Sequence, residues 1–209
     1  GKMGAVRLAG AHIGGDLSCY GATITNPSGP ALHGEHLQVA GNVSLRGGFT
    51  ADGFGELGAV RLAAAHIGGH LDCTVALLRN PTGPALQAGG ALQVAGRVFL
   101  REGFTAHGAG ELGAVRLVLA RIGGQLDCSG ATIRNSSGPA LFASSLQTGS
   151  SVLLHAGFTA DGDGEQGGVR CSARGGKRQA RGPGQHGRVG EENTQRGGPG
   201  CGVRQEQLA

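Results

Sequence analysis

The sequence has no tryptophan, one tyrosine and six phenylalanines, and only 15% of its residues are charged. So few large rings argue against a globular core packed around aromatic side chains, and the low charge argues against a polyelectrolyte tail protein. No apolar run approaches the roughly 18 residues that a membrane-spanning helix needs. The start at Gly1 is neither an initiator methionine nor a cleavable leader, and we expect a fragment of a longer chain that is soluble over this stretch.

Glycine is what the chain has in excess. Its 44 glycines and 7 prolines make up about a quarter of 209 residues, whereas glycine alone is normally roughly 7%. Such a composition is typical either of a disordered chain or of a repeat protein. The formal net charge of +4 is placed unevenly, because residues 1–168 carry a net charge of −1 and residues 169–209 a net charge of +5.

Three copies of one unit fill residues 1–168, with bounds 4–57, 58–112 and 113–166. The phrase GAVRLAGAHIGGDLSC starts at Gly4 and returns in closely similar form at Gly58 and at Gly113. A period of about 54 residues is typical of a stacked repeat architecture. The second unit carries one extra residue in the stretch QAGGA, where insertion into a loop is tolerated.

Within a unit the apolar residues form short i, i+2 pairs, such as Val6 with Leu8 and Ala11 with Ile13. This alternation is typical of strands. Because a pair recurs every five or six residues, the chain must turn a corner after each one, and glycine suits such corners. Four faces complete one coil, so we predict an all-β solenoid with two coils per unit and about six coils in total.

Two alternatives to the solenoid fit the sequence less well. A leucine-rich repeat has a shorter period, of roughly 20–29 residues, and its asparagine ladder is not recognised here. A disordered glycine-rich chain would not show such regular aliphatic pairs. The long repeat period and the regular aliphatic pairs therefore favour the solenoid.

The phrases GAxIGGxLxC and CxGATI, the second at Cys19–Ile24, carry a family resemblance. They resemble the pentapeptide-repeat class of right-handed quadrilateral β-helices. They are more closely similar to actinobacterial repeat proteins rich in GARIGG-type phrases, some of which are labelled membrane-associated oxidoreductase. The resemblance covers about residues 4–170 and implies a right-handed parallel β-helix. The longer corners at Thr25–Pro30 and Asp52–Gly58 depart from the strict pentapeptide pattern.

Residues 169–209 break the pattern and are dominated by Arg, Gly, Gln and Pro. We expect a disordered basic tail, because so few aliphatic side chains cannot bury enough surface to fold. One hypothesis is an RG-rich nucleic-acid-binding tail, from Arg174 and Arg196, each followed by two glycines. We favour either a frameshifted translation of further coils or a plain disordered end over a nucleic-acid-binding role. Translating the coding DNA in all three frames tests the frameshift.

The motif GxGxxG occurs three times, at Gly53, Gly55, Gly58; at Gly108, Gly110, Gly113; and at Gly162, Gly164, Gly167. Dinucleotide binding requires a helix directly after the motif. Here a predicted strand follows it, and we predict structural corners and no cofactor site.

Cys19, Cys73 and Cys128 occupy the same position in successive repeats. Neighbouring members therefore lie two coils apart, about 9.6 Å by strand spacing. That is too far for a disulfide, so we predict buried free thiols and a reducing, cytoplasmic location.

The acidic corners could offer oxygens to Ca²⁺; they contain Asp52 and Glu56, then His107 and Glu111, then Asp161, Asp163 and Glu165. The second corner replaces an acid with His107, and we predict solvated turns without a metal.

His12, His66 and Arg121 share an outward slot that we do not expect to be catalytic, and no nucleophile–base pair is recognisable from spacing. Arg7, Arg61 and Arg116 are predicted to form an outward basic stripe, with Glu56 and Glu111 near in sequence, for which ion pairing between coils is the expected explanation.

These observations predict no catalytic, cofactor-binding or metal-binding residue. The leading hypothesis for function is a non-catalytic β-solenoid scaffold or interaction module with an unknown protein partner. The alternative is the repeat region of a membrane-associated oxidoreductase-like protein whose chemistry, and any membrane contact, lie elsewhere. Mimicry of DNA would need a strongly acidic rod and is disfavoured. Unpaired strand edges also predict end-to-end self-association.

Overall fold

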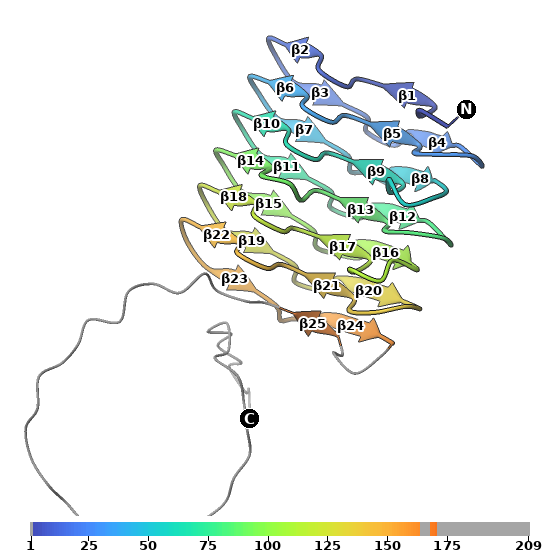
Figure 1. The fold of residues 1–209 in the computed structure, drawn as a ribbon. Coiled ribbons are helices and arrows are strands. Elements are labelled where there is room, and N and C mark those ends of the chain that lie inside the picture. Colours follow the sequence, from blue (N-terminus) through green and yellow to red (C-terminus); the bar gives the residue numbers. More distant parts are fainter. Residues whose placement is uncertain (1, 164–167, 171–209) are drawn as a thin grey trace, which may run out of the picture.

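The computed structural model describes residues 2–163 and 168–170, and every regular element in this part of the chain is a short β-strand. The strands pair in parallel, each with the strand four places further along the chain. Four strands therefore complete one coil, and six coils stack into a rod (Figure 1). The predicted all-β parallel solenoid with four faces is confirmed.

The 25 strands form four sheets, named A to D in the order in which the chain visits them. Sheet A contains β1 (Val6–Arg7), β5 (Leu32–His33), β9 (Val60–Arg61), β13 (Leu86–Gln87), β17 (Val115–Arg116), β21 (Leu141–Phe142) and β25 (Val169–Arg170). Sheet B contains β2 (His12–Ile13), β6 (Gln38–Val39), β10 (His66–Ile67), β14 (Gln93–Val94), β18 (Arg121–Ile122) and β22 (Gln147–Thr148). Sheet C contains β3 (Leu17–Ser18), β7 (Val43–Ser44), β11 (Leu71–Asp72), β15 (Val98–Phe99), β19 (Leu126–Asp127) and β23 (Val152–Leu153). Sheet D contains β4 (Thr23–Thr25), β8 (Thr50–Asp52), β12 (Leu77–Arg79), β16 (Thr105–Gly108), β20 (Thr132–Asn135) and β24 (Thr159–Gly162).

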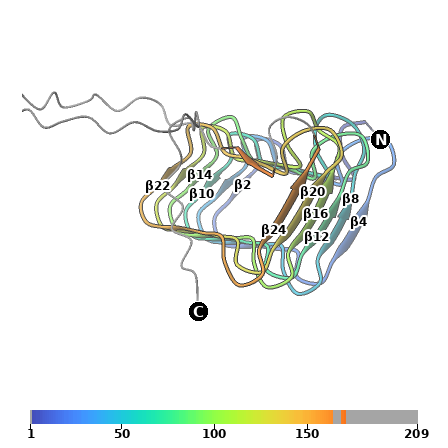
Figure 2. The ribbon, with the colours of Figure 1, turned by 90° about the horizontal axis from the view of Figure 1, so that it is seen from below.

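The coils alternate in length. Val6 pairs with Leu32 and Leu32 with Val60, so a coil of 26 residues is followed by one of 28. Viewed along the rod, sheets B and D lie on opposite sides of the coil (Figure 2). The long corners connect sheet D to sheet A and leave the four-sided cross-section intact. In the second repeat the extra residue lies at the predicted loop, where Ala91 has a φ of 70°.

The interior explains why the repeat contains two coils. In several inward columns a small residue of one coil lies against a large residue of the next, whereas other columns, such as Val6, Leu32 and Val60, hold large aliphatic residues in every coil. The stacked column that begins at Ala22 alternates Ala22, Phe49, Ala76, Phe104, Ala131 and Phe158. The column that begins at Cys19 alternates Cys19, Leu45, Cys73, Leu100, Cys128 and Leu154. The column that begins at Ile24 alternates in the opposite sense: Ile24, Ala51, Leu78, Ala106, Ile133 and Ala160.

The large residues of the alternating columns lie fully inside the rod. Phe49, Phe104, Leu45 and Leu100 are fully buried, with no exposed area. A coil that repeated its own large residues directly above itself would overpack these columns, because a protein interior is already close-packed. In these columns the repeating unit is therefore a pair of coils.

Buried asparagines close the corner between sheets D and A in every second coil. Asn80 is 1% exposed, and its Nδ2 donates to the carbonyl of Gly55 at 2.8 Å and to that of Pro84 at 3.0 Å. Asn135 makes the equivalent pair of bonds, and Asn26 donates to the carbonyl of Pro30. All three asparagines occupy one position of the repeat, where the sequence predicts a corner but not these buried hydrogen bonds.

Strand β25 pairs with β21, so the described solenoid extends to Arg170, two residues beyond the boundary expected at 168. The predictions made for the tail, including those for Arg174 and Arg196, lie outside the described residues. The same holds for Glu165, Gly164 and Gly167 in the third acidic corner.

Candidate functional site

The GxGxxG motif lies between two strands, as predicted. Its first copy follows β8 and precedes β9, and no helix occurs in the described part of the chain. A Cβ atom at Gly53 would lie 2.5 Å from the Cα of Ala59, and Gly58 has a φ of +94°. Gly55 supplies the carbonyl that Asn80 bonds. Each glycine therefore has a packing or backbone role in the corner.

The cysteines form the predicted inward column. Cys73 and Cys128 are buried, Cys19 is half-buried, and all three are free thiols. A leucine from the intervening coil separates each cysteine from the next. Burial raises the pKa of the Cys73 and Cys128 thiols far above its usual range, and the neighbouring Asp72 and Asp127 raise it further. These thiols are protonated and unreactive at neutral pH.

The acidic corners do not converge on one point. Asp52 forms an ion pair with Arg79 of the next coil, with 3.6 Å between Oδ1 and Nη1. No group of three potential metal ligands occurs among the residues that the structure describes. Asp52 and Asp161 therefore lie beside arginines of sheet D, whereas Glu56 and Glu111 lie near Arg116 of sheet A.

The predicted arginine stripe on sheet A is interrupted. Strand register places His33 between Arg7 and Arg61, and Gln87 between Arg61 and Arg116. Arg61 pairs across coils as expected, but its partner is Glu35, which sequence reasoning did not single out. Arg61 Nη2 lies 2.6 Å from Glu35 Oε1, and Nε donates to Oε2 at 3.1 Å.

This bidentate contact favours the ionised form of Glu35. The hydrogen bonds from Arg61 hold the pKa of Glu35 below its usual value, in spite of partial burial, which raises it. A bidentate guanidinium–carboxylate pair is among the stronger polar contacts in proteins. The pair ties the second coil to the third on the outside of the rod.

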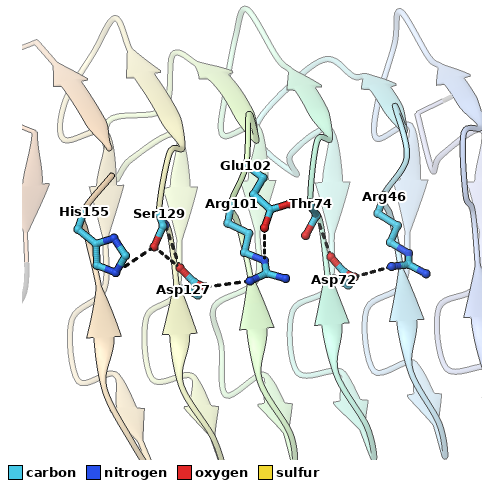
Figure 3. Close-up of polar contacts among 8 residues, drawn as sticks. All are labelled: Arg46, Asp72, Thr74, Arg101, Glu102, Asp127, Ser129 and His155. Atoms are coloured by element: carbon cyan, nitrogen blue, oxygen red, sulfur yellow. Dashed lines mark hydrogen bonds and ion pairs between the residues drawn. The ribbon is translucent and has the colours of Figure 1, made fainter. Parts of the chain in front are cut away.

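A second polar network runs along the edge of sheet C (Figure 3). Arg46 forms an ion pair with Asp72, and Arg101 with Asp127, each between neighbouring coils. The carboxylates also accept backbone N–H bonds at 3.0 Å from Thr74 and Ser129 respectively. We call this set the sheet C edge network; it consists of Arg46, Asp72, Thr74, Arg101, Glu102, Asp127, Ser129 and His155. Its charged side chains are largely satisfied by one another.

Stacking brings Ser129 and His155 together, a pair that spacing in the sequence did not reveal. His155 Nε2 lies 3.4 Å from Ser129 Oγ, and Ser129 Oγ donates to Asp127 Oδ1 at 2.5 Å. In a hydrolytic triad the acid contacts the imidazole and the imidazole takes the hydroxyl proton. Here the acid contacts the hydroxyl itself. The arrangement orders this edge and does not activate Ser129 as a nucleophile.

The outward side chains of sheet B behave differently. His12, His66 and Arg121 do share one outward slot, as predicted, and glutamines from the intervening coils lie between them in register. We call this row the sheet B column; it consists of His12, Gln38, His66, Gln93, Arg121 and Gln147. None of these side chains has a hydrogen bond or ion pair with another described residue.

The sheet B column borders a shallow hollow that runs across at least five coils. Beside it the backbone carries Gly14, Ala40, Gly68, Ala95 and Gly123. A Cβ atom at Gly68 would lie 2.2 Å from the carbonyl oxygen of Ala40, so close stacking excludes larger side chains there. The result is a smooth strip beside a row of regularly spaced donors and acceptors.

Comparisons with protein-family models, curated proteins and solved structures find no match to this chain. The four-sided parallel solenoid itself is consistent with a pentapeptide-repeat-like β-helix. Within the described residues, no helix is long and apolar enough to cross a membrane.

Proposed function

We propose that this chain is a non-catalytic interaction module, a rigid rod that binds a protein partner along sheet B. The observation that carries the proposal is the sheet B column, six polar side chains in register that make no bonds within the described protein. Their donors and acceptors are available to a partner, whereas those of the sheet C edge network are used internally.

Two physical features support the choice of this face. Parallel strands stack at about 4.8 Å, so the column presents polar groups at a constant spacing that a rigid partner can match. The smooth strip from Gly14 to Gly123 lets another surface approach the backbone closely. The column also places Arg121 and two histidines on this face, which favours a neutral or acidic partner surface.

Site-specific photo-crosslinking in the cells that produce the protein tests this proposal. A photoreactive residue at Gln38, on sheet B, is expected to give a discrete crosslinked product. The same residue at Ser44, on sheet C of the same coil, is the matched control. A substitution on the same face, Gln93→Arg, should reduce the product from Gln38 at least severalfold. Equal products from both positions, or no effect of Gln93→Arg, would contradict a partner on sheet B.

A further inference from the structure

Sheet D carries a run of positive charge that the interaction face does not explain. Its second outward row places Arg79 on β12, His107 on β16 and Arg134 on β20 in direct register. We call these three residues the cationic column. Asp52 on β8 precedes the column in the same row, and Asp161 on β24 follows it. Adjacent members of the row are one strand spacing apart, about 4.8 Å.

The neighbouring acids compensate the column unequally. Arg79 has Asp52 at 3.6 Å. Arg134 makes no ion pair within 4.0 Å with any described residue, although Asp161 is next to it in register. The charges of the two arginines lower the pKa of His107, after the larger effect of partial burial. At His107 the charges of the two arginines therefore make the local potential positive.

Two hollows meet at His107. One is lined by residues that include Asp52, Arg79, Asn80 and Pro81, and the other by residues that include Arg134, Asn135, Asp161 and Asp163, with His107, Gly108 and Ser136 shared by both. The raised corners between sheets D and A form the walls. The hollows are large enough to admit a small anion beside His107, and the side chains of Arg79 and Arg134 approach it from either side.

We propose that the cationic column binds a tetrahedral oxyanion, as free phosphate or as the terminal group of a phosphate monoester. The imidazole N–H of His107 donates to one oxygen, and Arg134 supplies a guanidinium that matches two more. A dianion fits better than a carboxylate, because its charge balances those of Arg79 and Arg134. The carboxylates of Asp52, Asp161 and Asp163, which line the same hollows, oppose a second anion and limit the site to one.

Proton NMR of the His107 imidazole, in the full chain, tests this assignment. The signal is identified by its loss in His107→Gln, and the pKa of His107 is followed during titration with inorganic phosphate. Binding should be saturable and should raise this pKa, because the bound dianion stabilises the imidazolium. Affinity, expressed per phosphate dianion, should fall as pH rises through the pKa of His107. A phosphate monoester of glycerol is titrated in parallel to tell a free anion from an esterified one.

Arg134→Gln is the decisive variant and should weaken phosphate binding at least tenfold. Arg97→Gln, at an exposed arginine between sheets B and C, is its matched control and should leave binding unchanged. Chloride at the same ionic strength separates binding from screening. A shift that does not saturate, that chloride reproduces, or that survives Arg134→Gln would overturn the proposal. Because it concerns sheet D alone, its failure would leave the proposed role of sheet B untouched.

Discussion

The two coils of each repeat solve the same packing problem with opposite side chains. The 26-residue coil places cysteine and alanine where the following coil places leucine and phenylalanine, so that each small residue lies between two large ones. The corners differ in the same way, since asparagine alternates with glycine between sheets D and A. The difference shows that neither coil is a complete structural unit. Each one defines the space that the other fills.

Removing a large residue from the second type of coil should have the greatest effect. Phe104→Ala is expected to lower the free energy of unfolding by about 3–5 kcal/mol, because it leaves a cavity between Ala76 and Ala131. Phe99→Ala is the matched control, since Phe99 points outward from sheet C and should cost less than about 1 kcal/mol. Urea unfolding followed by circular dichroism measures both, and equal losses would show that the alternation is unimportant.

Enlarging a small residue of the first type of coil tests the other half of the comparison. Ala76 is 1% exposed and stacks between Phe49 and Phe104. Ala76→Leu should destabilise by about 1–3 kcal/mol through overpacking. The neighbouring Ala91 is half-exposed in a loop, and Ala91→Leu serves as the control. If Ala76→Leu has the stability of the unaltered protein, the column is less tightly packed than the alternation implies.

The corner asparagine should matter almost as much as the core. Asn80→Ala removes both side-chain bonds to the carbonyls of Gly55 and Pro84, each of which keeps a single backbone N–H bond. The expected loss is about 1–3 kcal/mol. Thr82→Ala removes an exposed hydroxyl that bonds Gly55 N and Asn80, and it should cost less because water can replace it. Hydrogen exchange of the amides in this corner would show whether the loss is local, and unchanged protection in Asn80→Ala would contradict the role given to it.

The ion pair outside the coils should have the smallest effect and the clearest dependence on pH. Because the pKa of Glu35 is lowered in the fold, its pairing with Arg61 stabilises the protein above the usual pKa of 4.5. That contribution is lost as pH falls through the lowered value. Glu35→Gln should therefore cost about 0.5 kcal/mol at pH 7 and less at pH 3, as the pH falls toward and through the lowered pKa. Thermal unfolding at both pH values measures this, and an equal cost at both would rule out ionisation as the cause.

The internal repeat gave reliable information about the inside of the rod. Residues such as Leu45 and Cys73 could be assigned inward because i, i+2 alternation is local and does not depend on neighbouring coils. The corners at Gly53–Gly58 were also predictable, since strands precede and follow them. The repeat was less informative about the outside, because aligning repeats compares residues about 54 positions apart, whereas neighbours in the rod are 26 to 29 positions apart.

That difference explains each error and omission. Arg7 and Arg61 looked like neighbours in a stripe, but His33 lies between them. Glu35 was overlooked as the partner of Arg61 because the two residues are 26 positions apart, which is about half a repeat. Ser129 and His155 were overlooked for the same reason, since their separation equals one coil.

The sequence by itself determined that the chain forms a four-sided stack and which side chains line its interior, because period-two alternation and glycine-rich corners act locally. Only the tertiary structure decided which outward residues meet. Contact between coils depends on the register of parallel strands, which no short-range pattern in the sequence specifies. The extra residue of the second repeat shows this, because its loop absorbs the insertion while His66, Gln93 and Arg121 stay in register.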